Sequence, residues 1–134
     1  MGRRIPSRET LISAAATSVN AGVRVSDYRN CILSVIGSPT ANMKVFIKGA
    51  IGDTRPDFTV LSSNRSATGN AWDFVEVVDL EDGTAIDGDD GVSLSGNSVR
   101  LLEVNINSLD WLSVHSTAVV AGTITVAGSF TTNE

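Results

Sequence analysis

The acidic side chains of one short stretch are the residues of this chain whose types and spacing could do chemistry. The thirteen residues "DLEDGTAIDGDDG" at positions 79–91 hold six acids, three glycines and no basic residue. Calcium in proteins takes about six to eight oxygen ligands, many of them carboxylates. Two carboxylates flanking a substrate could instead act as general acid and base. The third interpretation is that these acids lie in solvated turns. The six acids are Asp79, Glu81, Asp82, Asp87, Asp89 and Asp90.

The spacing of these acids favours turns. An EF-hand calcium loop needs an oxygen ligand at its fifth position, where a loop beginning at Asp79 has Gly83 and one beginning at Asp87 has Gly91. Acid catalysis needs a carboxyl in an apolar pocket that raises its pKa, whereas acids beside glycines are expected to stay solvated. Asp-Gly pairs are typical of tight turns, because glycine adopts positive φ and aspartate bonds to the local backbone. We therefore predict turns with no metal ion and no cofactor, and keep an irregular calcium site as the alternative.

The other reactive side chains are too few for a catalytic constellation. His115 is the only histidine and Cys31 the only cysteine, which is fewer ligands than a zinc site takes. The sequence contains no G-x-S-x-G nucleophile motif and no phosphate-binding glycine loop. We interpret His115 as a structural imidazole and Cys31 as a small buried side chain. The sequence therefore predicts no catalytic residues and a protein that is not an enzyme.

The two tryptophans offer a different kind of binding. Trp72 and Trp111 could form a platform on which a sugar ring stacks. In a β-sandwich, tryptophans are more often anchors in the core or at an interface. We favour the anchor interpretation and keep sugar binding as the alternative.

The elements that must position these residues are predicted to be β-strands. Residues 30–37 form a short apolar run typical of a buried strand, and residues 43–49 alternate between apolar residues and Lys44 and Lys48. The period of two predicts that both lysines lie outward, and the turn residues between the two segments predict a hairpin. Further strands are expected at 9–19, 71–80, 110–116 and 121–130 and in a pair, 91–96 with 98–107, joined by Gly96-Asn97; a turn is expected at 20–22 and a long loop at 49–70.

Short strands separated by Gly, Asn and Asp turns predict an all-β fold. No segment of about ten residues shows a strong helical period, so we expect a single-domain antiparallel β-sandwich, jelly-roll-like, rather than an α/β sheet. The 134 residues suit one domain, which we place at residues 10–134. Residues 1–9 are expected to form a short extended N-terminal arm, because Pro6 disfavours a helix there.

The charges divide the chain into a basic tip and an acidic middle. The formal net charge of −5 argues against nucleic-acid binding by the body of the protein, and no apolar stretch is long enough to span a membrane. Arg3, Arg4 and Arg8 are the charged residues of positions 1–8. Because arginine pairs bidentately with carboxylates, we expect the arm to contact a neighbouring chain.

The later part of the chain resembles small structural proteins from the head–tail gene clusters of tailed bacteriophages. The resemblance extends from Asn42 to Val126 and is carried by six motifs. They are "NMKVFIKGA" (42–50), "WDFVEVVDL" (72–80), "IDGDDG" (86–91), "EVN" (103–105), Trp111 and "GTITV" (122–126).

The resemblance implies a non-enzymatic virion component that is assembled in the host cytoplasm. It implies a capsid decoration or cement protein that stabilises the head by bridging capsid subunits, with the major capsid protein or another virion protein as its partner. A tail or head–tail connector component and a carbohydrate-binding β-sandwich module are the alternatives. We expect a homo-oligomer, a trimer or a dimer, that binds neither nucleic acid nor membranes. The expected interface residues are Arg3, Arg4, Arg8, Trp72 and Trp111.

Overall fold

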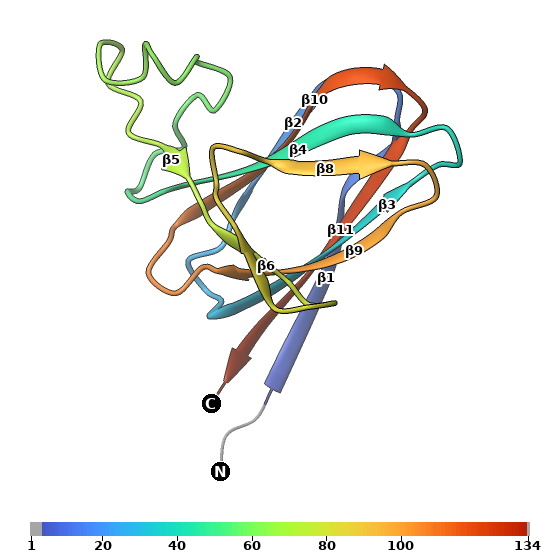
Figure 1. Ribbon diagram of the computed structural model, residues 1–134. Coiled ribbons are helices and arrows are strands. Elements are labelled where there is room, and N and C mark those ends of the chain that lie inside the picture. Colours follow the sequence, from blue (N-terminus) through green and yellow to red (C-terminus); the bar gives the residue numbers. More distant parts are fainter. Residues whose placement is uncertain (1–3, 134) are drawn as a thin grey trace.

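The chain folds as two antiparallel β-sheets packed face to face (Figure 1). The computed structural model describes residues 4–133, and the regular structure of these residues is β throughout. The strands are β1 (Arg4–Ala15), β2 (Val19–Arg24), β3 (Asn30–Gly37), β4 (Asn42–Ala50), β5 (Asp73–Phe74), β6 (Val77–Asp79), β7 (Thr84–Ile86), β8 (Val92–Ser95), β9 (Val99–Asn105), β10 (Trp111–Ala121) and β11 (Ile124–Asn133). The all-β sandwich predicted from the sequence is confirmed.

The strand order is that of a jelly roll with an insertion. The larger sheet has six strands in the order β1-β11-β3-β9-β6-β7. The smaller sheet has five, in which β2-β10-β4 is continued by β5 and β8, each paired with a different part of β4. Without the insertion, the two sheets are the four-stranded halves of a jelly roll, with the strand orders β1-β11-β3-β9 and β2-β10-β4-β8. The strands β5, β6 and β7 belong to an insertion, residues 51–91, between β4 and β8.

The period of two in the sequence places the core as predicted. On β4, Met43, Val45 and Ile47 are 2%, 0% and 3% exposed, and Leu102 of β9 is equally buried. Because successive side chains of a strand point to opposite faces, each strand contributes one apolar row to the space between the sheets. Cys31 lies in this core, and burial raises the pKa of its thiol to about 12. The interpretation of Cys31 as a small buried side chain is confirmed.

Both predicted hairpins are wrong, because consecutive strands cross from one sheet to the other. β3 pairs with β9 and β11, whereas β4 pairs with β10, β5 and β8. In the same way β8 pairs with β4, whereas β9 pairs with β3 and β6. The alternation of side chains tells which face of a strand is buried, but it carries no information about which strand lies beside it.

The crossing connections meet at one end of the sandwich and bond to one another there. The amide of Gly37, the last residue of β3, donates to the carbonyl oxygen of Ser98 (2.9 Å). The amide of Gly96, directly after β8, donates to the carbonyl oxygen of Ala41 (2.7 Å). The turn between β10 and β11 joins them through Gly122, which has a φ of +78°. A Cβ at Gly122 would lie 2.5 Å from the Cα of Ala41, so both the backbone conformation and the close approach require glycine.

The N-terminal segment is part of the sandwich's edge. β1 runs without a break from Arg4 and pairs with β11 from Arg4↔Asn133 onward. The boundary expected between residues 9 and 10 therefore has no counterpart among the described residues. The ends of β1 and β11 pass beyond β3, whose last pair is Asn30↔Thr131, and project as a two-stranded ribbon (Figure 1).

Two further segments differ from the prediction. Residues 20–22, expected as a turn, lie inside β2, and the chain turns earlier, at residues 16–18. Residues 71–80, expected as one strand, divide into β5 in the smaller sheet and β6 in the larger one. The segment that crosses between the sheets starts at Val75, whose amide donates to the Ile47 carbonyl oxygen (2.9 Å).

Candidate functional site

A loop of the insertion packs against the outer face of the five-stranded sheet. Residues 51–72 contain no strand, so the long loop predicted at residues 49–70 is confirmed except at its first two residues, which end β4. Phe58 and Trp72 of this loop, each 2% exposed, form a small second core with Ala50 at the end of β4. Phe74 and Trp111 pack against this cluster. Buried aromatic rings remove a large apolar area from water, so the cluster holds the loop on the sheet.

Lys48 is buried beneath this loop, although the sequence predicted an exposed lysine. Its side chain points away from the main core, as the period of two requires, but it is 5% exposed because the loop covers it. Its Nζ donates to the carbonyl oxygen of Phe58 (2.9 Å) and contacts Nδ1 of His115 (3.1 Å). The same ammonium lies 4.4 Å from the centre of the Trp72 ring. A protonated lysine only donates, so Nδ1 of His115 accepts and the imidazole proton is on Nε2.

The surroundings shift both of these bases towards their neutral forms. Removal from water lowers the pKa of Lys48. The pKa of His115 is lowered chiefly by burial and further by the positive charge of Lys48. His115 is therefore neutral at pH 7 and serves as an acceptor for the buried ammonium, which is a structural role.

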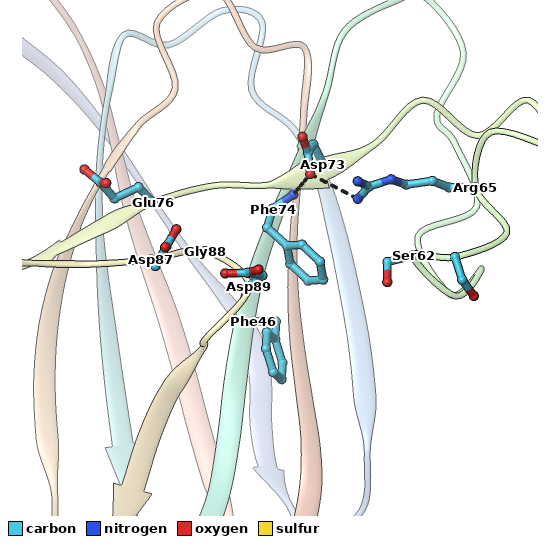
Figure 2. Close-up of a pocket in the computed structure, with 10 residues that line it drawn as sticks. Phe46, Ser62, Arg65, Asp73, Phe74, Glu76, Asp87, Gly88 and Asp89 are labelled. Atoms are coloured by element: carbon cyan, nitrogen blue, oxygen red, sulfur yellow. Dashed lines mark hydrogen bonds and ion pairs between the residues drawn. The ribbon is translucent and has the colours of Figure 1, made fainter.

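An open groove of about 770 Å³ lies between the loop and the acidic turns (Figure 2). Phe46 and Phe74 line it with their rings 5.8 Å apart. On the loop side, Nη1 of Arg65 lies 3.0 Å from Oδ1 of Asp73, and Asp89 approaches from the acidic turn (Figure 2). Aromatic rings surrounded by a few charged groups make a surface that can bind a small polar ligand.

Asp79, the first acid of the stretch, starts a turn and also forms a buried ion pair. The side chain of Asp79 is 8% exposed, and its Oδ2 accepts bonds from Nη2 (2.6 Å) and Nε (2.8 Å) of Arg100. This pair joins the end of β6 to β9. The prediction that all six acids are solvated is wrong for Asp79. It holds for Asp82, an exposed residue whose Oδ1 accepts the Thr84 amide (2.9 Å); the bonds from Thr84 lower the pKa of Asp82.

The end of the stretch is a tight turn with three exposed carboxylates close together. Carboxylate oxygens of Asp87, Asp89 and Asp90 lie within 4.8 Å of one another. The carbonyl oxygen of Asp87 accepts the Asp90 amide (3.1 Å), and that of Asp90 accepts Nζ of Lys44 (3.0 Å). A Cβ at Gly88 would lie 2.8 Å from the Cβ of Phe74, so glycine lets the turn pack against β5.

The residues predicted to form an interface lie in separate places. Arg3 lies outside the described residues, and Arg4 is described as the first residue of β1. Arg8 is exposed on the outer face of the six-stranded sheet. On the opposite sheet, Trp72 lies in the second core beneath the insertion loop and Trp111 packs against that core. Nε1 of Trp111 donates to the Gly52 carbonyl oxygen (2.9 Å). The structure places both tryptophans at one cluster and separates them from Arg8.

Sequence reasoning missed Lys48, Arg65 and the two phenylalanines of the groove. Lys48 and His115 are 67 residues apart in the chain, and Arg65 lies in a loop without periodicity. No local pattern marks these residues, because their neighbours in space come from distant segments.

The described residues contain no helix that is long and apolar enough to cross a membrane.

Comparison with known proteins identifies the fold. No protein-family model matches the sequence, and no curated protein matches it either. The crystal structure of the SPBc2 prophage-derived protein YomS is similar, with a TM-score of 0.69 over 97% of this chain and 96% of that chain at 12% sequence identity. This chain therefore shares its fold, over nearly its whole length, with a prophage-derived protein.

Proposed function

We propose that this chain is a non-enzymatic structural component of a bacteriophage particle, and more narrowly a capsid decoration or cement protein that stabilises the head by bridging capsid subunits. The observation that carries the non-enzymatic role is the use made of the reactive side chains. Lys48 bonds to His115 beneath the loop, Asp79 pairs with Arg100, and Cys31 lies in the core. These groups hold the fold together, where a catalyst would direct them at a substrate.

The shared fold and the sequence motifs support the phage part of the proposal. YomS is prophage-derived, and the likeness covers 97% of this chain. The resemblance of residues 42–126 to proteins of head–tail gene clusters points in the same direction. In this role the protein resides in the virion and binds the major capsid protein or another virion protein. A tail or head–tail connector component is the alternative within the same class.

Quantitative mass spectrometry of purified particles tests the proposal and separates its two forms. A decoration protein should be present in a number of copies that is a simple fraction or multiple of the capsid subunits. A tail or connector component should be present in a few copies. Heads made without the chain should break at a lower temperature than complete heads if the chain is a cement protein. Absence of the chain from washed particles would contradict the proposal.

The groove beside Phe46 and Phe74 favours carbohydrate binding as a second candidate function. The tryptophan platform considered from the sequence does not form, because Trp72 is buried and the indole of Trp111 bonds to the loop. The aromatic residues that line the groove are the two phenylalanines. A glycan array probed with the wild type and with Phe74→Ala tests this function. Binding that the substitution abolishes would support it, and a wild type that binds no glycan would remove it.

A further inference from the structure

The outer face of the six-stranded sheet is open to solvent and carries a cluster of exposed apolar side chains on one half. Outward-pointing side chains form three rows across β1, β11, β3 and β9, as the strand register defines. The rows are Arg8–Ser129–Ile32–Glu103, then Thr10–Ala127–Ser34–Leu101, then Thr125–Ile36–Val99. Ile36, Val99 and Leu101 are 45%, 66% and 47% exposed, and Leu80, whose amide bonds to the Leu101 carbonyl oxygen, is 42% exposed. Clustered exposed apolar side chains of this kind mark an interaction surface.

The outer faces of the two sheets differ in how far other parts of the chain cover them. The outer face of the five-stranded sheet receives the loop 51–72, which buries Phe58 and Trp72 against it. On the six-stranded sheet, the exposures of Ile36, Val99 and Leu101 show that the described residues leave this part of the face uncovered.

We propose that this face binds the same face of a second copy of the chain, about a two-fold axis that runs parallel to the strands between β11 and β3. The two halves of the face are complementary in size. The β3/β9 half carries the large apolar side chains Ile36, Val99 and Leu101, and apart from Arg8 the β1/β11 half carries small ones. The small ones are Thr10, Thr125, Ala127 and Ser129. An axis in this position lays the large half of each copy on the small half of the other, as an isologous interface requires.

The two charged side chains of these rows, Arg8 and Glu103, are also placed so that the same two-fold axis pairs them. Arg8 and Glu103 stand at opposite ends of the first row, and both are exposed. Neither forms an ion pair with another described residue. Three strand spacings, about 14 Å, separate them. The two-fold axis places Arg8 of each copy opposite Glu103 of the other, so every dimer gains two Arg–Glu pairs. This self-complementarity identifies a second copy as the partner.

This inference rests on the proposed function, because it describes the dimer in which a structural protein of the particle would attach to its neighbours. A pair of chains joined by these faces keeps both five-stranded sheets on the outside. The dimer then presents two identical sets of surfaces to neighbouring subunits of a shell, and attachment gains from avidity.

Sedimentation velocity of the isolated full chain tests the apolar part of the interface. The wild type is expected to form a dimer. Leu101→Asp should weaken dimerisation on the order of 100-fold, because each copy then buries an unpaired carboxylate in the apolar part of the contact. Leu61→Asp is the matched control, since Leu61 is 69% exposed on the insertion loop and should leave the dimer unchanged. A wild type that stays monomeric at about 100 μM, or a dimer that Leu101→Asp does not weaken, would overturn the inference.

Charge reversal tests the two-fold axis. Arg8→Glu and Glu103→Arg should each weaken the dimer about tenfold, because each substitution brings two like-charged pairs together. The double variant restores opposite charges and should dimerise like the wild type. A double variant as weak as the single ones would refute the proposed axis. A chain that is present in particles but monomeric in solution would overturn this inference alone, and a dimer that is absent from particles would overturn only the proposed function.

Discussion

At the scale of single residues, Lys48 and His115 show how the covering loop changes the chemistry of two ordinary side chains. An ammonium taken out of water is costly unless its donors are satisfied. Here the Phe58 carbonyl, the His115 imidazole and the Trp72 ring satisfy it. Protonation of His115 would remove one acceptor and place two positive groups 3.1 Å apart.

We expect this contact to make the fold less stable in acid. The pKa of His115 is lowered in the folded chain, so the unfolded chain binds the proton more readily. The free energy of unfolding therefore falls as the pH drops from the ordinary histidine pKa of about 6.5 through the folded value. His115→Gln keeps an acceptor and removes the titration. Urea unfolding at pH 7 and pH 5 should show a smaller loss in the variant than in the wild type; equal losses would show that His115 makes no contribution.

Among the acids of residues 79–91, we expect substitution of Asp79, the partner of Arg100, to lower the free energy of unfolding most. Breaking a fully buried pair costs about 3–5 kcal/mol. Because the Arg100 side chain keeps 28% exposure, we expect Asp79→Asn to lower the free energy of unfolding by about 2–3 kcal/mol. Asp82→Asn is the control, because Asp82 is an exposed turn residue, and it should change the stability far less. Equal effects of the two substitutions would contradict the distinction drawn between them.

At the scale of elements, the N-terminal segment and the insertion loop are held in different ways. Residues 4–8 are held by backbone pairing with β11. The loop 51–72 is held by a small aromatic cluster outside the main core. Regions held by few buried contacts open more readily than core strands, so the two elements should respond differently to substitution.

Deletion of residues 1–8 is expected to destabilise the sandwich. It removes the pairing of Arg4–Arg8 with Ser129–Asn133 and exposes the edge of β11 beside Phe130, which is 1% exposed. The melting temperature should fall by about 5 °C. Deletion of residues 1–3 leaves the described pairing intact and should have little effect. If the protein without residues 1–8 melts at the same temperature as the full-length protein, this edge pairing adds no stability.

Substitution of Trp72 is expected to release the loop rather than unfold the sandwich. Trp72→Ala removes the largest side chain of the second core and the ring that faces Lys48. Hydrogen exchange should then speed up across residues 51–72 while β3 and β9 stay protected. Leu61→Ala, at a loop position that is 69% exposed, should leave exchange unchanged. Uniformly faster exchange in all strands would show that the loop and the sandwich open together.

At the scale of the whole molecule, we expect stability without a bound metal. The carboxylates of Asp87, Asp89 and Asp90 are close enough to share an ion. Calcium needs more oxygen ligands than these three groups supply singly. The nearby carbonyl oxygens of Asp87 and Asp90 already accept hydrogen bonds, one of them from Lys44. The melting temperatures in millimolar calcium and in EDTA should agree within about 1 °C. A calcium-dependent rise of several degrees that Asp89→Ala abolishes would establish a metal site.

The sequence by itself determined the class of the fold and the buried face of its main strands. Met43, Val45 and Ile47 were predicted inward, and they lie in the core. Such predictions succeed because the period of two is a local property of an extended chain. The identity of the neighbouring strands was decided only by the tertiary structure, so the predicted hairpins failed where the chain crosses between the sheets.

The same difference explains which site residues could be predicted. The Asp-Gly turn around Asp87 was predicted because a turn depends on adjacent residues. The burial of Lys48, its contact with His115 and the pairing of Asp79 with Arg100 depend on segments that meet only in the folded chain. A side chain's partners and its exposure are set by whichever distant segment packs against it, and a local pattern in the sequence contains no record of that segment.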